Sequence, residues 1–399
     1  MHKEFKKIIS IADKDLANWF AKNQREFGST IYSSVDIRDN GQKIAPVDTN
    51  LFPAGFNNLN DKEIIDASTE ISNFLSNHFS EIKSIGLLVE SHTRNLNYFK
   101  NLFALKKIFE KTGIDFQLIS LSHSEKLIVN ETEIQIAIFP AKTESGYIRT
   151  EDFVFDVLVS NNDFSDGIPA ELRQVKQPII PTVCSGWFNR KKSNYLEIYD
   201  LTIKEFSRYF GLDPFYYQAA YKNCGKIDFK KKLGLDCVAN SVDKMIYTLN
   251  KEYLEHGIKQ TPYVFIKAER GTYGMGITTV KDGEEVYSMN KKIRNKMDVI
   301  KGGAKNTEVI IQEGISSHLK YKDYPAEVMI YTVNSKIISR ILRFNTQKDS
   351  LSSLNSSGLQ FMNFQDSLVK LQKKNMIKIY DIIAKVAVLA AARELESLY

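Results

Sequence analysis

The segment that most restricts the fold of this chain is KAERGTYGMGITTV, which runs from Lys267 to Val280. A lysine ends an apolar strand, three glycines follow between 271 and 276, and a second strand then resumes. Glycines let a turn bring backbone N–H groups close to an anion, and a lysine supplies a compact charge for a phosphate. Because no helix follows, the segment is neither a P-loop nor a Rossmann turn, both of which need one. It therefore predicts a hairpin, either a phosphate-binding lid or a structural turn.

The composition of the chain indicates a large globular protein that suits small anionic ligands. Its 399 residues are 43% hydrophobic, and the formal net charge of +6 is spread along the sequence without a basic stripe. We therefore expect about two or three domains and no nucleic-acid partner. The start of the chain lacks a signal-peptide core, and no apolar run reaches membrane-spanning length, so we expect a cytoplasmic protein without a membrane partner. The three cysteines match no zinc spacing, and the sequence leaves open whether the chain forms a homo-oligomer.

The order of apolar runs predicts an α/β fold in the N-terminal half and antiparallel strands further on. Short apolar runs between 83 and 182 alternate with helix-like or turn-rich stretches, which is typical of a mostly parallel sheet covered by helices. Residues 36–58 are polar and unperiodic, and we expect a long loop there, packed by Phe52 and Phe56. Patterns from 194 to 257 are largely helical, strands joined by turns follow, and the last segment is helical. The main boundary is predicted near Leu201.

Segments after residues 271–276, which we call the glycine loop, add a candidate nucleotide site. The strand EVIIQEGI runs straight into Gln312, Glu313 and Gly314, and such a sequence suits an adenine pocket in which backbone and amide groups contact the base edge. A hairpin then carries polar side chains, and a small flexible turn follows it; the residues are Glu327, Arg340, Arg343, Asn345 and Asn355. Because Arg340 and Arg343 fall on opposite faces of a strand, only one can face a ligand, and we choose Arg343.

Polar clusters in the N-terminal half are candidates for binding an amino acid. VESHTRN and LVSNNDFSDGIP place polar residues directly after apolar strands, where open α/β sheets bind ligands, and CSGWFNRKKS adds a third cluster with the basic run at 190–192. Structural alternatives stay open for these clusters. Glu90 and His92 also suit the cap of a helix, Trp187 suits a core position, and the basic run at 190–192 suits a solvated helix face.

The motifs together resemble the ATP-grasp type of bacterial glutamate–cysteine ligase, the family of the first enzyme of glutathione synthesis. The resemblance rests on SVDIRDNGQKIAPVDTNLFPAGFNNL, VESHTRN, SNNDFSDGIP, GWFNRKKSNY, FGLDPF, NCGKIDF, IKAERGTYGMGI, IQEGI, LNSSGLQF and the closing VAVLAAARE, and it spans about 34 to 393. It implies an α/β (α+β) ATP-grasp fold: an N-terminal α/β substrate-binding domain (1–200), a helical connection (201–260), a lid subdomain (261–320) and a C-terminal subdomain (321–399). It also implies that ATP, with Mg²⁺, drives formation of γ-glutamylcysteine from L-glutamate and L-cysteine through an acyl phosphate.

The resemblance also implies roles for individual residues. Lys267 and Arg343 would neutralise charge during phosphoryl transfer, so that losing either should lower turnover more than stability. The ATP contacts would be Lys267, Gly271, Thr272, Gly274, Gly276, Gln312, Glu313 and Ile315. The substrate contacts would be Arg38, Lys43, Asn50, Asn57, Asn58, Arg94, Asn161 and Asn162. The metal ligands would be Glu327, Asn345 and Asn355.

Two departures from the pattern keep alternatives open. The lid reads AERGTYG where an acid followed by glycine is expected, so Arg270 either contacts phosphate or faces solvent. The last strand has no Glu-x-Asn pair of the kind that holds magnesium in many ATP-grasp enzymes. The alternatives are therefore a ligase for another amino acid or peptide pair, and a non-catalytic ATP-binding regulatory protein.

Overall fold

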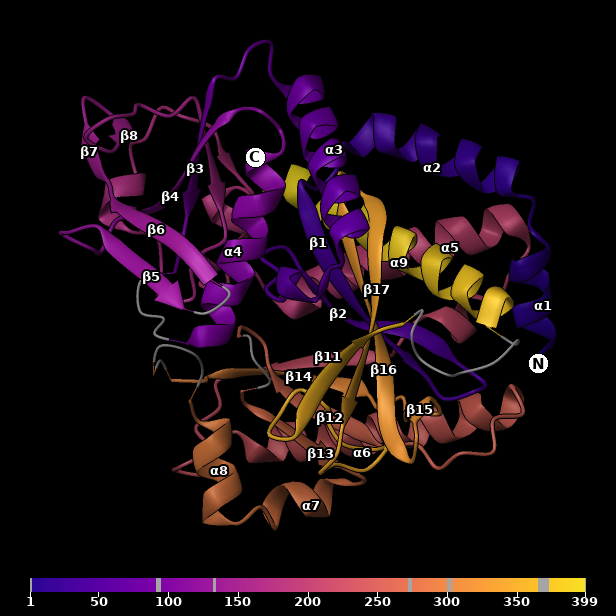
Figure 1. Cartoon of the computed structure of the whole chain (residues 1–399). Helices are drawn as coiled ribbons and strands as arrows, with labels where there is room; N and C mark the ends of the chain where they lie inside the picture. The colour runs from indigo at the N-terminus through magenta and orange to yellow at the C-terminus, as the bar shows by residue number, and fades with distance from the viewer. Residues whose placement is uncertain are drawn as a thin grey trace.

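A long antiparallel sheet, which we call the central sheet, brings together strands from distant parts of the chain (Figure 1). The computed structural model describes residues 2–90, 95–131, 134–271, 275–299, 303, 305–364 and 373–398. The central sheet has the order β18 (Leu359–Asn363), β17 (Lys336–Asn345), β16 (Tyr324–Val333), β1 (Tyr32–Asp39) and β2 (Ile44–Asn50), and the short β15 (Lys320–Tyr321) pairs with β16. The central sheet thus combines strands from the predicted N-terminal domain (1–200) and the predicted C-terminal subdomain (321–399). The short β15 lies at the predicted boundary between the lid subdomain and the C-terminal subdomain.

The expected polar loop at 36–58 is wrong for its first half, which forms the hairpin of β1 and β2. The two strands pair so that Asp36 lies opposite Asp48. Val35 and Ile37, on the other face, are fully buried in the core. The alternation of apolar and polar side chains that is typical of a strand is therefore present, but its polar residues resemble those of a loop.

The helix α9 (Lys373–Glu396) covers the apolar face of the central sheet. Its run VAVLAAARE is almost entirely buried, and the small alanines let the helix approach both the sheet and the helix α5 (Lys192–Phe210) closely. The helices α1 (Lys3–Ser10) and α2 (Asp13–Phe27) pack against α9. Residues from both ends of the described chain thus share one core.

The predicted mostly parallel sheet is confirmed. Its order is β10 (Ile179–Ile180), β9 (Val157–Ser160), β3 (Ser84–Leu88), β4 (Asp115–Ser120), β6 (Ile134–Pro140) and β5 (Leu127–Glu131), and only the β5–β6 pair is antiparallel among these described strands. The helices α3 (Asp61–His78) and α4 (Leu96–Glu110) pack between this sheet and the second face of the central sheet. A small hairpin of β7 (Lys142–Glu144) and β8 (Tyr147–Arg149) lies beside it.

A third sheet, which we call the small sheet, carries the glycine segment. Its order is β11 (Tyr221–Gly225), β14 (Glu308–Glu313), β12 (Val264–Ala268) and β13 (Ile277–Val280). β12 and β13 form the predicted hairpin, with Lys267 paired to Ile277. The helix α6 (Leu235–Glu255) packs on the sheet, and α7 (Gly283–Tyr287) and α8 (Lys291–Met297) follow β13.

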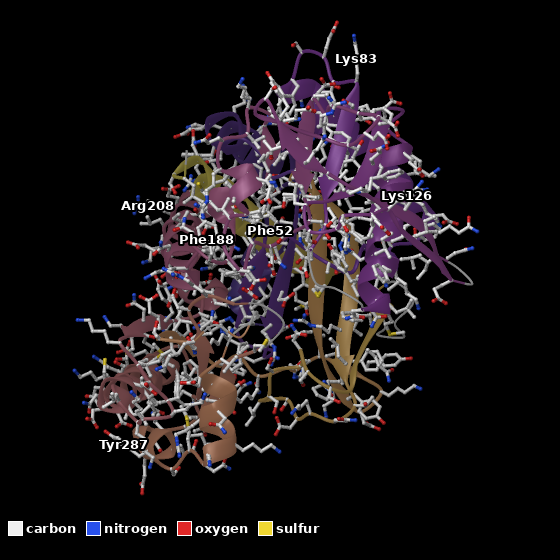
Figure 2. The ribbon with its side chains drawn as sticks, turned by 90° about the vertical axis from the view of Figure 1, so that its left-hand side faces the viewer. Phe52, Lys83, Lys126, Phe188, Arg208 and Tyr287 are labelled. Atoms are coloured by element: carbon white, nitrogen blue, oxygen red, sulfur yellow. The ribbon has the colours of Figure 1, made fainter. Side chains whose placement is uncertain are left out.

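The parallel sheet and the small sheet lie at opposite ends of the molecule. Figure 2 shows Lys83 at one end and Tyr287 at the other, with Phe52 and Phe188 between them. Among the described residues, no helix combines the length and apolar character that a membrane crossing needs. The central sheet and the start of α5 meet the small sheet in the middle of this arrangement.

Candidate active site

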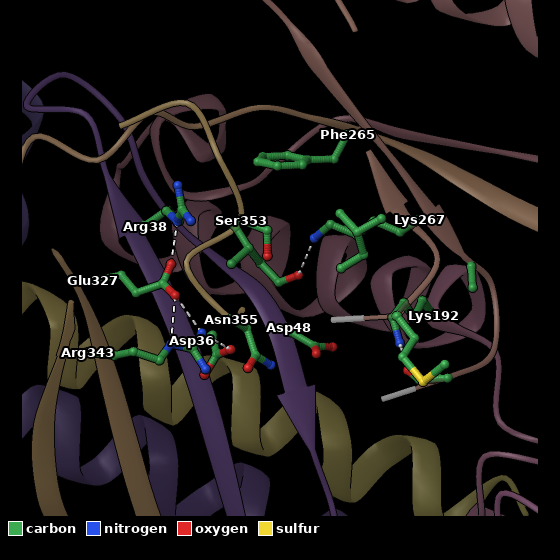
Figure 3. Close-up of a pocket in the computed structure, with 15 residues that line it drawn as sticks. Asp36, Arg38, Asp48, Lys192, Phe265, Lys267, Glu327, Arg343, Ser353 and Asn355 are labelled. Carbon is green, nitrogen blue, oxygen red and sulfur yellow. Dashed lines mark hydrogen bonds and ion pairs between the residues drawn. The ribbon is translucent and has the colours of Figure 1, made fainter. Parts of the chain in front are cut away.

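A cleft lies where the central sheet faces the small sheet (Figure 3). It encloses about 670 Å³, part of it open to solvent. The central sheet supplies charged side chains, and the small sheet supplies a lysine and an aromatic ring. Lys192 comes from α5, Ser353 and Asn355 come from the loop before β18, and Gly271 and Met275 come from the segment between β12 and β13. The lining residues are Asp36, Arg38, Val47, Asp48, Lys192, Phe265, Lys267, Ala268, Gly271, Met275, Ile277, Glu327, Arg343, Ser353 and Asn355.

The central-sheet wall of the cleft is a network of buried ion pairs. Arg343 donates from Nε to Glu327 Oε1 at 2.7 Å, and its Nη2 contacts Asp36 Oδ2. Arg38 donates from Nε to the other oxygen of Glu327 and from Nη2 to the carbonyl of Ser352 at 2.9 Å. Antiparallel register explains the network, because Glu327 pairs directly with Arg343 and β1 runs beside β16.

Burial and neighbouring charge give the two carboxyl groups of this network, Asp36 and Glu327, different pKa values. Burial raises the pKa of Asp36 to about 6, although Arg343 opposes the shift. Burial would also raise the pKa of Glu327, but Arg343 and Arg38 together lower it to about 2. Glu327 is therefore a fixed anion, whereas Asp36 is close to its titration point near neutral pH.

The small-sheet wall presents Lys267 to the cleft. Its Nζ donates to Gln312 Oε1 at 2.6 Å and to the carbonyl of Val47 at 3.3 Å, and within the described part of the chain it has no carboxylate partner. Burial lowers the pKa of this lysine to about 8. Gly271 and Gly276 both have positive φ, +137° and +60°, and a Cβ on Gly276 would lie 3.1 Å from that of Ala268. Glycine is thus required where the loop leaves and rejoins the hairpin.

The start of α5 holds the beginning of the glycine loop. The backbone N–H of Ser193 donates to Glu269 Oε1 at 2.7 Å, and Lys192 Nζ donates to the carbonyl of Gly271 at 2.8 Å. Lys192 also lies 3.9 Å from the ring of Trp187. The surrounding protein lowers the pKa of Lys192, mainly through desolvation. The cleft therefore contains a second lysine without a carboxylate partner among the described residues.

The expectation of a solvated face at 190–192 is wrong for Arg190. This side chain is buried, donates from Nε and Nη2 to the Glu394 carboxylate of α9 at 2.9 to 3.0 Å, and donates from Nη1 to the carbonyl of Thr49 at 2.7 Å. Lys191 does pair at the surface with Glu308. The three basic residues therefore have different surroundings: Arg190 forms a buried ion pair, Lys191 forms a surface ion pair, and Lys192 lines the cleft.

The predicted adenine strand is held by one of the predicted substrate residues. Lys43 Nζ lies 2.7 Å from both carboxylate oxygens of Glu313, and all of these groups are buried. Tyr253 and the backbone N–H of Ala220 donate to the same carboxylate at 2.7 and 2.9 Å. With its oxygens occupied in this way, Glu313 fixes the end of β14, and Lys43 is its counter-ion. The buried Ile315 packs with Ala45 and Ala219 next to it.

Most of the predicted asparagine contacts hold the backbone instead of facing the cleft. Asn161 donates to the carbonyl of Pro53 at 3.1 Å and accepts from Asn101. Asn50, Asn58 and Asn162 each bond to a backbone group two or three residues away. Asn57 is exposed in a short 3-10 helix (Phe56–Asn58). The predicted residues Arg94, Thr272 and Gly274 lie outside the described residues.

The three predicted metal ligands have different surroundings. Each oxygen of Glu327 accepts from an arginine. Asn345 is fully buried; its Oδ1 accepts from the backbone of Gln347 and its Nδ2 donates to the carbonyl of Leu354, both within 2.9 Å. That geometry makes Asn345 a brace for the loop at 354–358; its role as a metal ligand stays a prediction. Asn355, in the same loop, lines the cleft.

Four polar residues of the cleft were absent from the predicted site: Asp36, Asp48, Lys192 and Ser353. The signal for Asp36 was present in the sequence, since Asp36 and Arg38 are two residues apart and therefore share a strand face. Reading 36–58 as a loop concealed it. Lys192 belongs to the basic run at 190–192, which also suited a solvated helix face, and Ser353 carries no comparable local pattern.

Comparisons with known proteins agree with this arrangement. Residues 6–395 match the GshA family, described as glutamate-cysteine ligase. A crystal structure from Methylobacillus flagellatus KT, of a protein provisionally assigned as gamma-glutamylcysteine synthetase, is 32% identical with a TM-score of 0.90, and the match covers 98% of this chain and 95% of that one.

Two more distant structures also match in part. D-alanyl-alanine synthetase A from Vibrio cholerae is 13% identical with a TM-score of 0.37, covering 78% of this chain and 81% of that one. A glutathione synthetase-like effector from Globodera pallida is 10% identical with a TM-score of 0.38, covering 85% of this chain and 75% of that one. Likeness at this level supports no argument here. No curated protein matches the chain.

Proposed function

Because this chain belongs to the glutamate–cysteine ligase family and is therefore an ATP-dependent ligase that joins L-glutamate to L-cysteine in glutathione biosynthesis, we propose that the reaction takes place in the cleft between the central and small sheets. One observation carries the proposal. Lys267 and Lys192 face the cleft from one side without a carboxylate partner in the described part of the chain, and oxygen donors face it from the other. Such a site suits a polyphosphate and a metal ion.

We infer an ATP-grasp arrangement, in which the two sheets hold ATP between them. The phosphates would lie along Lys267 and Gly271, where a backbone without a Cβ can approach an anion. The base would pack against the ring of Phe265, which lines the cleft beside Lys267, with the strand end at Gln312–Ile315 as its edge contact. The loop would close over the phosphates and exclude water from the reacting groups.

In the proposed mechanism, the γ-carboxylate of glutamate attacks the γ-phosphate of ATP and gives an acyl phosphate. The amine of cysteine then displaces phosphate, so that the protein needs no nucleophile of its own. Lys267 and Lys192 reduce the repulsion between the two anions, and Arg343 and Arg38 hold Glu327 in place behind them. Catalysis therefore consists of positioning and charge neutralisation.

The donor set is compatible with magnesium shared with a nucleotide. Within the described residues, no cluster of three or more His, Cys, Asp and Glu forms a self-contained metal site. Magnesium bound to nucleotide phosphates usually takes only one or two carboxylates from the protein. We propose that Asp48 and Asn355, with Asp36 beside them, would hold Mg²⁺, which supplies charge neutralisation at the phosphates when bound. Glu327 would contribute by orienting the two arginines.

The test measures ADP release and the peptide product in the presence of ATP and Mg²⁺. We expect ADP release to require glutamate and cysteine together, and mass spectrometry to find γ-glutamylcysteine. Replacing cysteine by 2-aminobutyrate or glycine distinguishes a ligase for a different pair. A protein that binds ATP but shows no ADP release dependent on the amino acids would be a non-catalytic binding protein, and the proposal would fail.

The matched variants for this test are Lys267→Met and Lys191→Met. Both variants replace a lysine by an apolar side chain of similar length. Lys267 lines the cleft, whereas Lys191, just before α5, pairs with Glu308 at the surface. We expect Lys267→Met to lower kcat/KM for ATP by about 10²-fold or more, as for other groups that neutralise transition-state charge. Lys191→Met should change it little. Equal losses in the two variants would contradict the assignment of the cleft.

A further inference from the structure

Two cysteines outside the cleft lie close enough to react with each other. Cys224, near the end of β11, and Cys237, in the first turn of α6, have their Sγ atoms 3.3 Å apart. Cys224 is buried and Cys237 is exposed. The sulfur of Cys224 also lies 3.4 Å from Ser241 Oγ, on the next turn of the same helix. The pair therefore combines one exposed thiol with one that is largely buried.

The loop between the two cysteines holds them in this position. Asp228 and Leu233 exchange two backbone hydrogen bonds of 3.0 Å, and the N–H of Ile227 donates to the carbonyl of Thr307. Gly234 has φ of +75°, and a Cβ there would lie 2.8 Å from the carbonyl oxygen of Lys226. Ile227 is buried in the core. The short distance between the sulfurs is thus set by a folded loop and not by two mobile chain ends.

We propose that Cys224 and Cys237 form a thiol–disulfide exchange site, which a low-molecular-weight disulfide converts into a reversible intramolecular disulfide. The Sγ atoms must approach by little more than about 1 Å to reach the S–S bond length of about 2.05 Å. Rotation of the exposed Cys237 side chain can supply most of that movement.

The exchange proceeds in two balanced steps. The thiolate of Cys237 attacks one sulfur of the disulfide RSSR, forms a mixed disulfide and releases RS⁻. The thiol of Cys224 then loses its proton and attacks Sγ of Cys237, which forms the Cys224–Cys237 bond and releases the second RS⁻. Two protein thiols are oxidised by two electrons, and one RSSR is reduced to two RSH.

Burial explains why Cys237 is the point of entry. It raises the pKa of the Cys224 thiol to about 11, so this group is protonated at neutral pH and is shielded from bulk reagents. Once Cys237 carries a mixed disulfide, its sulfur is already beside Cys224. The intramolecular step then benefits from a high effective concentration.

The resulting bond would connect α6 to the edge strand of the small sheet. Cys224 pairs with Val309 of β14, which in turn pairs with Ala268, the last residue of β12 before the glycine loop. Oxidation would therefore fix the edge of the sheet at the end where the loop leaves it. We expect the oxidised protein to have a higher Tm than the reduced protein, because the bond closes a loop in the unfolded chain.

The experiment uses the full chain with Cys184→Ser, which leaves only the two cysteines of the pair. This protein is incubated with 2-hydroxyethyl disulfide and then analysed by intact mass, thiol titration and peptide mapping without reductant. We expect a loss of two hydrogen atoms in mass, loss of both thiols and a cross-linked peptide that contains Cys224 and Cys237. Dithiothreitol should reverse all three changes.

Two further variants separate the steps. With Cys224→Ser added, the probe should remain on Cys237 as a stable mixed disulfide, and with Cys237→Ser added, the native protein should react slowly and form no internal bond. If the protein with both cysteines also accumulates only the mixed disulfide, or if the internal bond appears only after unfolding in urea, the proposal is overturned. These readouts require no ligase activity, so they are independent of the proposed function.

Discussion

At the scale of single residues, Arg343 has a structural role that the sequence did not indicate. Its guanidinium lies between Asp36 and Glu327, and its side chain is 8% exposed. Removing one partner of a buried ion pair typically costs about 3–5 kcal/mol, because the other charge is left uncompensated. We therefore expect Arg343→Met to lower the free energy of unfolding by that amount as well as to abolish most activity, as measured by urea denaturation and ADP release.

Arg340 provides the matched control for this prediction. It lies on the opposite face of β17, as the alternation predicts, and pairs with Asp381 of α9 with a quarter of its side chain exposed. Arg340→Met should cost about 1 kcal/mol or less and leave turnover nearly unchanged. An Arg343→Met protein with normal stability and low turnover would restore the original expectation of a purely catalytic residue.

The lowered pKa of Lys267 predicts a pH dependence of ATP binding. The lysine is charged below its pKa of about 8 and becomes neutral as the pH rises through that value. Because the charged form attracts phosphate, we expect the Kd for ATP to increase as the pH rises above about 8. Lys267→Arg should bind ATP without this increase, because an arginine stays protonated across the range. Calorimetry of ATP binding to both proteins measures the difference, and a wild-type Kd that is constant across pH 8 would contradict it.

At the scale of elements, hydrogen bonds connect the first turn of α5 to Glu269, the residue that follows β12 and precedes the glycine loop. Glu269 accepts a hydrogen bond from Ser193 in the first turn of α5, and the N–H of Lys192 donates to the carbonyl of Glu269 at 3.2 Å. A carboxylate at this position also interacts favourably with the helix dipole. We expect Glu269→Ala to cost about 1 kcal/mol in stability and to raise the KM for ATP, because the loop loses its anchor.

Glu269→Gln is the control for that prediction, since its amide oxygen can still accept the hydrogen bond from Ser193. It should retain most of the stability and have a KM for ATP between those of the wild type and Glu269→Ala. Steady-state kinetics at varied ATP concentration and thermal unfolding measure the two effects. If Glu269→Ala has the KM of the wild type, the anchor has no part in nucleotide binding.

The elements also show which parts of the fold could be predicted. The parallel sheet and the hairpin of β12 and β13 follow from local apolar patterns, and both were predicted. For the hairpin of β1 and β2 the local pattern predicts a loop, because Asp36, Arg38 and Asp48 make its cleft-facing side polar. The pairing of Tyr32 with Val333 brings together residues about 300 positions apart, and no local pattern specifies such a contact. The glycine segment and three side chains of the central-sheet wall, Arg38, Glu327 and Arg343, could therefore be predicted, but the strand pairing that brings that wall together could not.

At the scale of the whole molecule, the ion pair of Arg190 and Glu394 connects the last helix to the cleft. Arg190 lies just before α5, Glu394 lies near the end of α9, and both side chains are at most 5% exposed. Arg190 also donates to the carbonyl of Thr49, next to Asp48 in the cleft. We expect Arg190→Met alone to lower the free energy of unfolding by about 3–5 kcal/mol, because it leaves a buried carboxylate unpaired.

A double-mutant cycle with Glu394→Leu tests whether this pair stabilises the protein or positions the cleft. Replacing a buried ion pair by two apolar side chains is often nearly neutral, so the double variant should recover most of the lost stability in urea denaturation. It cannot recover the hydrogen bond to Thr49, and we therefore expect kcat/KM to stay below the wild-type value even when stability returns. If activity and stability recover to the same extent, Arg190 acts only as a structural ion pair. If neither recovers, the pair is not the source of the stability, and the packing of α9 against α5 must supply it.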